Sequence, residues 1–264
     1  MRSRGGTADG AAVFSVLNEE AKKALTVERE AAAEAGGIVP WLALQQLLDS
    51  ALPIGGFSHS FGLETLVQEG AVRTSRQLED YLTAMLTQSW STSDLMVVKA
   101  VYRDVPAEDW QSLWHVERLV HVQRTADETR TGIEKMGRRL LRLLAAMHPR
   151  LDWRPLSEAS KRGDCLASHP LVFGYACHRF GIPLAQAAQG YLYGCIATGV
   201  NSALRLMSIG QTEGQQLIAR LAPRTVEAWV FASALRPEDA YANMPLGEIA
   251  MMRHEQLYSR LFMS

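Results

Sequence analysis

The sequence predicts an all-α protein with a single helical domain, and three observations carry that prediction. Apolar side chains recur every three or four residues over most of the chain, which is the spacing of a buried helix face. Prolines and Thr/Gln or Thr/Glu pairs stand where helices would begin. No sustained alternation of apolar and polar residues is bounded by hairpin turns, so no strand is predicted. We expect a bundle of about ten helices around one core.

The expected helices follow from this spacing and from their start signals. The predicted helical ranges are 41–48, 61–69, 74–102, 106–119, 125–147, 170–180, 183–204, 215–221, 225–235 and 248–262. Thr74 with Gln77, and Thr125 with Glu128, have the spacing of capping boxes. Pro106 stands at the first-turn position that proline favours, and it is predicted to open the helix that follows.

The range 181–204 contains no Asp, Glu, Lys or Arg and is long enough to span a bilayer. Its two glutamines, one asparagine and four glycines would be poorly satisfied in lipid, so a buried central helix is favoured over a membrane span. Gly190, Gly194 and Thr198 recur every fourth residue and leave one helix face nearly bare. A helix of the same chain or of a second copy in a dimer could approach closely there.

Composition narrows the class of protein. The 264 residues can bury a sizeable core, and 47% of them are hydrophobic. The formal charge of −1 provides no general attraction to nucleic acid or to an anionic membrane. Cys165, Cys177 and Cys195 show no C-x-x-C spacing, and the N-terminus has no apolar run of the signal-peptide kind. A cytoplasmic protein with buried thiols is the expectation.

Domain organisation follows from where apolar patterning begins. Residues 1–39 have only a thin apolar face and are interpreted as a flexible N-terminal extension. No long Gly, Ser or Pro linker interrupts residues 40–264, which favours a single domain. Within it, the range 243–264 combines an apolar stripe with arginines and methionines, a composition typical of a docking segment. Packing on its own domain is the equally weighted alternative.

A polar turn, LPIGGFSHSFGLETL, occupies residues 52–66. Pro53 cannot continue a helix, while Gly55 and Gly56 permit backbone angles that other residues avoid. The turn is interpreted either as a close-packed helix connection or as a main-chain surface that a partner reads. It resembles a G-x-S-x-G nucleophile elbow only in part, because Ser60 takes the last glycine's place and a helix precedes it.

Candidate catalytic and metal-binding residues form no coherent set. A hydrolase would need Ser58 and His59 as nucleophile and base, but sequence neighbours rarely meet that geometry. Cys177 and His178 are the most tempting metal pair, yet neighbours on a helix point about 100° apart. Three histidines are instead predicted to be buried with a satisfied partner: His115, His121 and His178. A chain without catalytic activity is predicted, with the hydrolase and a His/Cys metal-binding module as alternatives.

Two motifs in a fixed order resemble the urease accessory protein UreF family. LPIGGFSHSFGLETLVQEG lies near the start and MMRHEQLYSRLFMS at the end, with TSRQLEDYL and GYLYGCIATGVNSALRL between them. The resemblance implies an all-α, non-catalytic protein that forms a homodimer. It also implies a complex with the accessory protein UreD (also called UreH) and the GTPase UreG, which delivers nickel to the urease apoprotein. Nickel and GTP would be handled by that complex, so no cofactor is expected in this chain. A chain that itself binds nickel through His and Cys is the alternative.

The resemblance further implies a partner-binding surface made of two segments. The positions that match it are Pro53, Gly55, Gly56, Phe57, Ser58, Ser60, Glu64, Arg253, His254, Tyr258 and Arg260. Arg260 is the leading interaction residue, and Glu64 would accept hydrogen bonds from a partner. Some members have a tyrosine in the place of Phe57. A partner contact that those members make through the tyrosine hydroxyl is therefore not expected in this chain. The C-terminal segment is implied to become ordered on meeting UreD and then to help recruit UreG, as an activator or as a fidelity check.

Overall fold

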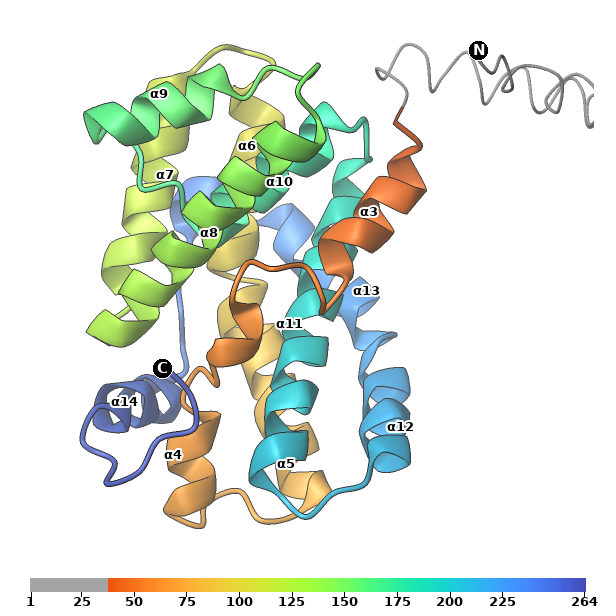
Figure 1. Cartoon of the computed structure of the whole chain (residues 1–264), viewed down its shortest axis with the longest axis vertical. Coiled ribbons are helices and arrows are strands. Elements are labelled where there is room, and N and C mark those ends of the chain that lie inside the picture. The colour runs from red at the N-terminus through yellow and green to blue at the C-terminus, as the bar shows by residue number, and fades with distance from the viewer. Residues whose placement is uncertain (1–37) are drawn as a thin grey trace, which may run out of the picture.

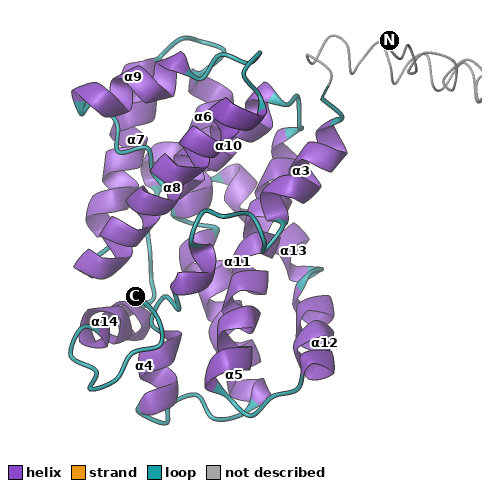
Figure 2. Ribbon diagram, in the orientation of Figure 1, coloured by secondary structure: helices purple, strands orange, loops and turns teal. Residues whose placement is uncertain are grey.

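Helix α11 (Leu184–Leu206) runs along the middle of the molecule, and helices from both ends of the chain pack around it (Figure 1). The computed structural model describes residues 38–264, and no strand occurs within that range (Figure 2). The other helical elements are α3 (Pro40–Leu48), η1 (Gly56–Ser58), α4 (Leu63–Gln68), α5 (Ser75–Met85), η2 (Leu86–Trp90), α6 (Asp94–Asp104), α7 (Trp110–Gln123), α8 (Asp127–Met147), α9 (Arg154–Arg162), α10 (His169–Arg179), α12 (Gln211–Leu221), α13 (Arg224–Ala234), η3 (Pro237–Asp239) and α14 (Pro245–His254). The prediction of an all-α fold with one shared core is confirmed.

The part of α11 before Arg205 contains no charged residue. This composition suits its position, because other helices surround α11 on most sides. A side chain added at Gly190 would come within 3.1 Å of Leu44, and one at Gly194 within 3.5 Å of Leu48, so α3 of the same chain covers this face. Thr198 lies half-buried one turn further on. Within residues 38–264, no helix is long and apolar enough to cross a membrane.

A second group of helices, α6, α7, α8 and α10, forms the upper part of the molecule in Figure 1. Helix α10 packs against both α6 and α8, and Gly174 lets it approach the backbone of Val98. The loop before α10 is held by Glu117, whose buried carboxylate accepts the N–H groups of Leu166 (2.9 Å) and Ser168 (2.8 Å). This part of the fold includes helix α9, which was not among the predicted helices.

Two of the three helix start signals named from the sequence are wrong, one for a local reason and one for a long-range reason. The capping box of Thr74 and Gln77 is confirmed at the start of α5. Pro106 lies in a turn, and α7 begins only after Asp109, whose carboxylate accepts the Ser112 N–H at 3.0 Å. The predicted capping box of Thr125 and Glu128 is absent because Thr125 donates to a distant acceptor instead. Its N–H and hydroxyl both donate to Glu248 of α14, at 3.0 and 2.7 Å, and α8 begins two residues later.

The long predicted segments are interrupted or shortened. The stripe predicted over 74–102 is broken after Met85 by the π-helix η2 and a turn, so α6 is a separate helix. The predicted helix over 248–262 is also wrong, since α14 ends at His254 and residues 255–264 fold back over α4 (Figure 1). Residues 1–37 lie outside the described part of the chain, while Ile38, assigned to the same extension, is buried in the core.

The buried histidines and thiols also differ from the prediction. His115 is exposed, and His121 and His178 are half-buried with one ring nitrogen unpartnered in each. The fully buried histidines are His59 and His254. Cys165 and Cys177 are buried as predicted, whereas Cys195 is half-buried. Burial raises the pKa of the Cys165 thiol to about 12, so this thiol stays protonated near neutral pH.

Candidate docking surface

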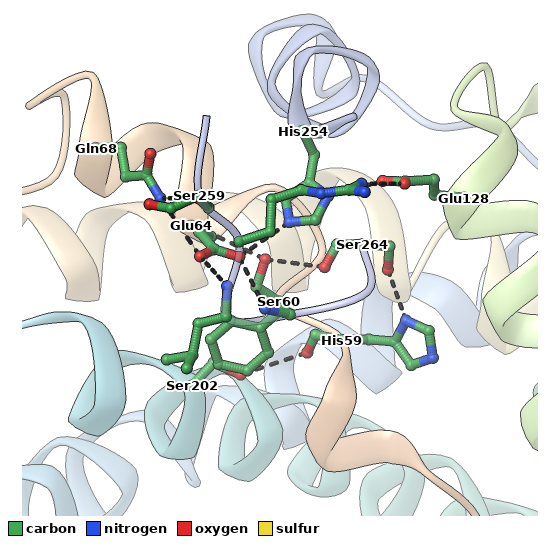
Figure 3. Close-up of polar contacts among 12 residues, drawn as sticks. His59, Ser60, Glu64, Gln68, Glu128, Ser202, His254, Ser259 and Ser264 are labelled. Carbon is green, nitrogen blue, oxygen red and sulfur yellow. Dashed lines mark hydrogen bonds and ion pairs between the residues drawn. The ribbon is translucent and has the colours of Figure 1, made fainter. Parts of the chain in front are cut away.

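The polar turn and the last ten residues lie side by side, although about 200 positions separate them in the sequence (Figure 3). The Met263 N–H donates to the Ser58 carbonyl at 2.7 Å. The Ser60 N–H and hydroxyl donate to the main-chain oxygen of Ser264, at 2.6 and 2.9 Å. The two predicted partner-binding segments therefore form one continuous surface.

The turn adopts its shape because two glycines take backbone angles that side chains disfavour. Gly55 has φ 91° and Gly62 has φ 89°, both in the left-handed region. At Gly62, a side chain would also come within 3.1 Å of Met251 and 3.2 Å of the Gly247 carbonyl. This bare position brings α14 close to α4, and so places the C-terminal tail (residues 255–264) over the turn.

Glu64 is the polar centre beneath this surface. Its side chain is almost completely buried, with the residue 1% exposed, in the first turn of α4. One carboxylate oxygen accepts the Leu261 N–H at 2.7 Å, and the other accepts the Phe262 N–H at 3.1 Å. A buried carboxylate is tolerated when donors satisfy it, and these two main-chain donors belong to the tail. Its oxygens are therefore occupied by groups of its own chain.

His254 links Glu64 to a second carboxylate. Its ring has no exposed surface, with Nε2 2.9 Å from Glu64 and Nδ1 2.7 Å from Glu128 of α8 (Figure 3). Each ring nitrogen therefore faces one carboxyl group, and the two carboxyl groups come from different helices. Arg260 pairs with the other oxygen of Glu128. The cluster therefore runs from the buried Glu64 and His254 to the exposed Arg260.

Other side chains contact the tail on the side away from Glu64. Phe262 is buried, and the Arg205 guanidinium lies 4.3 Å from the centre of its ring, within the range of a cation–π contact. Arg205 also donates to the Phe57 carbonyl at 2.9 Å, so it contacts both segments. His59 approaches the Ser264 hydroxyl at 2.7 Å. These contacts pack the tail on its own domain.

The predicted partner-binding residues divide into exposed and buried groups. The exposed ones are Pro53, Phe57, Arg253, Tyr258 and Arg260; Gly55, Gly56 and Ser58 are half-buried; and Ser60, Glu64 and His254 are buried. Sequence reasoning gave no docking role to three residues that shape the surface: His59, Glu128 and Arg205. Only Glu128 had a recognisable signal, and its position three residues after Thr125 suggested a cap instead.

An apolar face continues from the tail onto α14. Leu246, Ile249 and Met252 follow one another at helical spacing and are exposed, and Leu261 and Met263 of the tail are exposed as well. Arg253 and Arg260 lie among them, with Arg253 held by Glu69 at 3.3 Å. Methionine, aromatic and arginine side chains around an apolar centre are enriched at protein interfaces. This face can bind another protein.

The catalytic and metal alternatives gain no support from the geometry. His59 contacts the Ser264 hydroxyl, and no hydrogen bond joins it to Ser58 among the described residues. Within residues 38–264, no group of three or more His, Cys, Asp or Glu side chains could hold a metal ion. Burial raises the pKa of Cys177, which disfavours the thiolate that a metal would require.

The fold and the surface define the chain as an all-helical protein in which two distant segments build one apolar, arginine-edged surface. The model of the UreF family matches residues 72–222. Similar curated proteins, each named urease accessory protein UreF, come from Streptococcus salivarius and Arthrobacter sp. strain FB24. The first is 30% identical and covers 85% of this chain and 94% of its own length, and the second is 32% identical and covers 84% and 96%. The chain belongs to the UreF family of urease accessory proteins, which confirms the resemblance.

Proposed function

We propose that this protein is a cytoplasmic, non-catalytic scaffold that joins UreD to the GTPase UreG and regulates GTP-dependent nickel insertion into urease. Family membership supports a role in urease maturation. The observation that carries the proposal is the single surface formed by the turn and the C-terminal tail. In this proposal the chain holds no cofactor, and it reaches the urease apoprotein through the complex.

The two parts of the surface suit different contacts. The apolar face of α14, with Leu246, Ile249 and Met252, offers the desolvated area that a stable partner needs, and we assign it to UreD. Beside it, Phe57 is 65% exposed, and Arg260 provides a planar cation. An exposed aromatic ring and an arginine are typical residues of strong interface contacts, and we assign this edge to UreG.

Replacing Arg260 with alanine is expected to weaken UreG recruitment about 30-fold, since an interface arginine contributes about 2 kcal/mol. Capture of purified UreG by this protein with UreD present measures the effect. Arg154→Ala is the matched control, because Arg154 is an exposed arginine paired with Asp152 on the remote α9 side. Equal capture by the Arg260→Ala variant and the wild type, with both folded, would contradict the assignment.

We also propose that the protein forms a homodimer through the outer face of α3. That helix covers Gly190 and Gly194 with its inner side and exposes Trp41 and Leu42 on its outer side. Tyr193 of α11 is exposed as well and lines a shallow groove together with Leu42. Large exposed apolar side chains on neighbouring helices are typical of subunit contacts.

Trp41→Asp is expected to convert the dimer to a monomer, because it places a charge in the centre of the apolar contact. Light scattering coupled to size-exclusion chromatography measures the mass directly. Val122→Asp serves as a control, since Val122 is equally exposed but lies on α7. A dimer of unchanged stability in the Trp41→Asp variant would place the subunit contact elsewhere.

A further inference from the structure

A shallow groove lies beside α3 and α11, at the point where the described part of the chain begins. Its volume is about 750 Å³, and its apolar lining comes from Ile38, Val39 and Leu42 and from Tyr193 of α11. Val39, Leu42 and Tyr193 are 39%, 50% and 38% exposed, so the groove is open within residues 38–264. A groove of this size with exposed apolar walls is suited to holding apolar side chains.

The N-terminal extension joins the domain at this groove. Ile38 is the first described residue and lines the groove, so the residues before it depart from the groove wall. Gly36 and Gly37 come immediately before it, and a pair of glycines permits the chain to reverse its direction. A segment tethered this closely has an effective concentration in the millimolar range, so even a weak contact is populated.

The segment before Gly36 has the composition that such a groove can accept. Residues 11–35 are rich in Ala, Glu and Lys, which favours a helix. At helical spacing, Ala24, Val27, Ala31 and Ala35 fall on one side, and their small side chains would allow close approach to α3. The motifs shared with the UreF family begin at residue 52, so nothing in this segment follows from family membership.

We propose that the extension docks reversibly in the groove of its own chain and competes there with a second copy of the protein. Its narrow apolar face buries little area, so the contact is weak and the extension exchanges between docked and free states. When docked, it covers Leu42 and Tyr193, which belong to the subunit contact proposed above. The effect on the dimer rests on that proposed contact, whereas occupancy of the groove does not.

Competition of this kind lowers the affinity between subunits without altering the subunit contact itself. A second copy binds only those molecules whose groove is free, so the apparent Kd of the dimer rises as the docked fraction increases. An extension that is docked in about nine of ten molecules would weaken the dimer at least about tenfold. Releasing the extension should therefore tighten the dimer.

Disulfide formation in the full chain tests whether the extension occupies the groove. Ala31→Cys places one thiol on the apolar face of the extension, and Gln45→Cys places another on the exposed lining of the groove. Cys195→Ser removes the half-buried native thiol from this background, and the other two cysteines are buried. We expect a disulfide within one chain, identified by non-reducing electrophoresis and mass spectrometry, because docking brings the two positions together.

Two further variants separate docking from mere tethering. Val27→Asp adds a charge to the apolar face and should slow disulfide formation about tenfold, since a buried unpaired charge is disfavoured. Thr26→Asp is the matched control, because it adds the same charge on the opposite side at helical spacing and should leave the rate unchanged. Equal rates in the two variants, or disulfides that join two chains, would overturn the inference.

The competition is measured on the full chain without added cysteines. In sedimentation equilibrium, Val27→Asp should lower the Kd of the dimer at least about tenfold relative to Thr26→Asp. Equal Kd values in these two variants would contradict the competition. A disulfide that forms as expected in a chain that stays monomeric at every concentration would support the docked extension and reject the proposed homodimer alone.

Discussion

Gly137→Ala is expected to destabilise the protein by about 3 kcal/mol or more, at the upper end of overpacking costs. A Cβ at this position in α8 would overlap the Ala167 carbonyl oxygen and the backbone of Ser168 and His169. Backbone atoms cannot rotate aside as a flexible side chain can. This loop has little freedom to retreat, because Glu117 binds the N–H groups on either side of Ala167.

Urea unfolding followed by circular dichroism measures this change, and Gly194→Ala provides the control. An added methyl group at Gly194 meets only the Leu48 side chain, at an ordinary 3.5 Å. Alanine also has a helix propensity about 1 kcal/mol better than glycine, so this variant should be neutral or slightly stabilised. If Gly137→Ala unfolded within about 1 kcal/mol of the wild type, the close contact between α8 and the loop before α10 would be refuted.

Stability is expected to fall by about 3 kcal/mol between pH 6.5 and pH 4 because of His59 alone. Burial, together with the positive charges of Lys135 and His254, lowers the pKa of His59 from 6.5 to about 4. In this range the unfolded chain binds a proton at His59 that the folded chain does not, so acid favours unfolding. From about one pH unit above 6.5 the ring is neutral in both states and contributes no slope.

The pH dependence of the unfolding free energy, measured from pH 7.5 to pH 4, checks this prediction. His59→Gln removes the titrating group but keeps an amide that can reach the Ser264 hydroxyl, so its curve should be flatter than that of the wild type. His115→Gln is the control, since His115 is exposed on α7. Parallel curves for His59→Gln and the wild type would show that His59 does not carry the effect.

Much of the helical architecture could be predicted from the chain itself. The charge-free range 181–204 indicated a central helix, and α11 is surrounded by other helices. The capping box of Thr74 and Gln77 was predicted correctly because both partners lie within one turn of the same helix. These signals are local: the spacing of apolar residues and a cap three positions away do not depend on the rest of the fold.

Two of the errors occurred where distant acceptors compete with local ones. Thr125 has a capping partner three residues ahead, but Glu248 of α14 takes its hydrogen bonds. Apolar spacing continued the last helix to residue 262, but Glu64 binds the N–H groups of Leu261 and Phe262 in a conformation that is not helical. Spacing along one segment carries no information about an acceptor that arrives from another part of the chain.

The sequence by itself determined the helical class, the family and the two segments that carry its motifs. Only the tertiary structure decided that these segments join into one surface and that Glu64 and His254 lie beneath it rather than on it. The physical reason is that hydrophobic spacing is encoded within each helix, whereas a buried charge cluster exists only when α4, α8 and α14 meet. The bare backbone at Gly62 allows α14 to approach α4, and α14 also packs against α8.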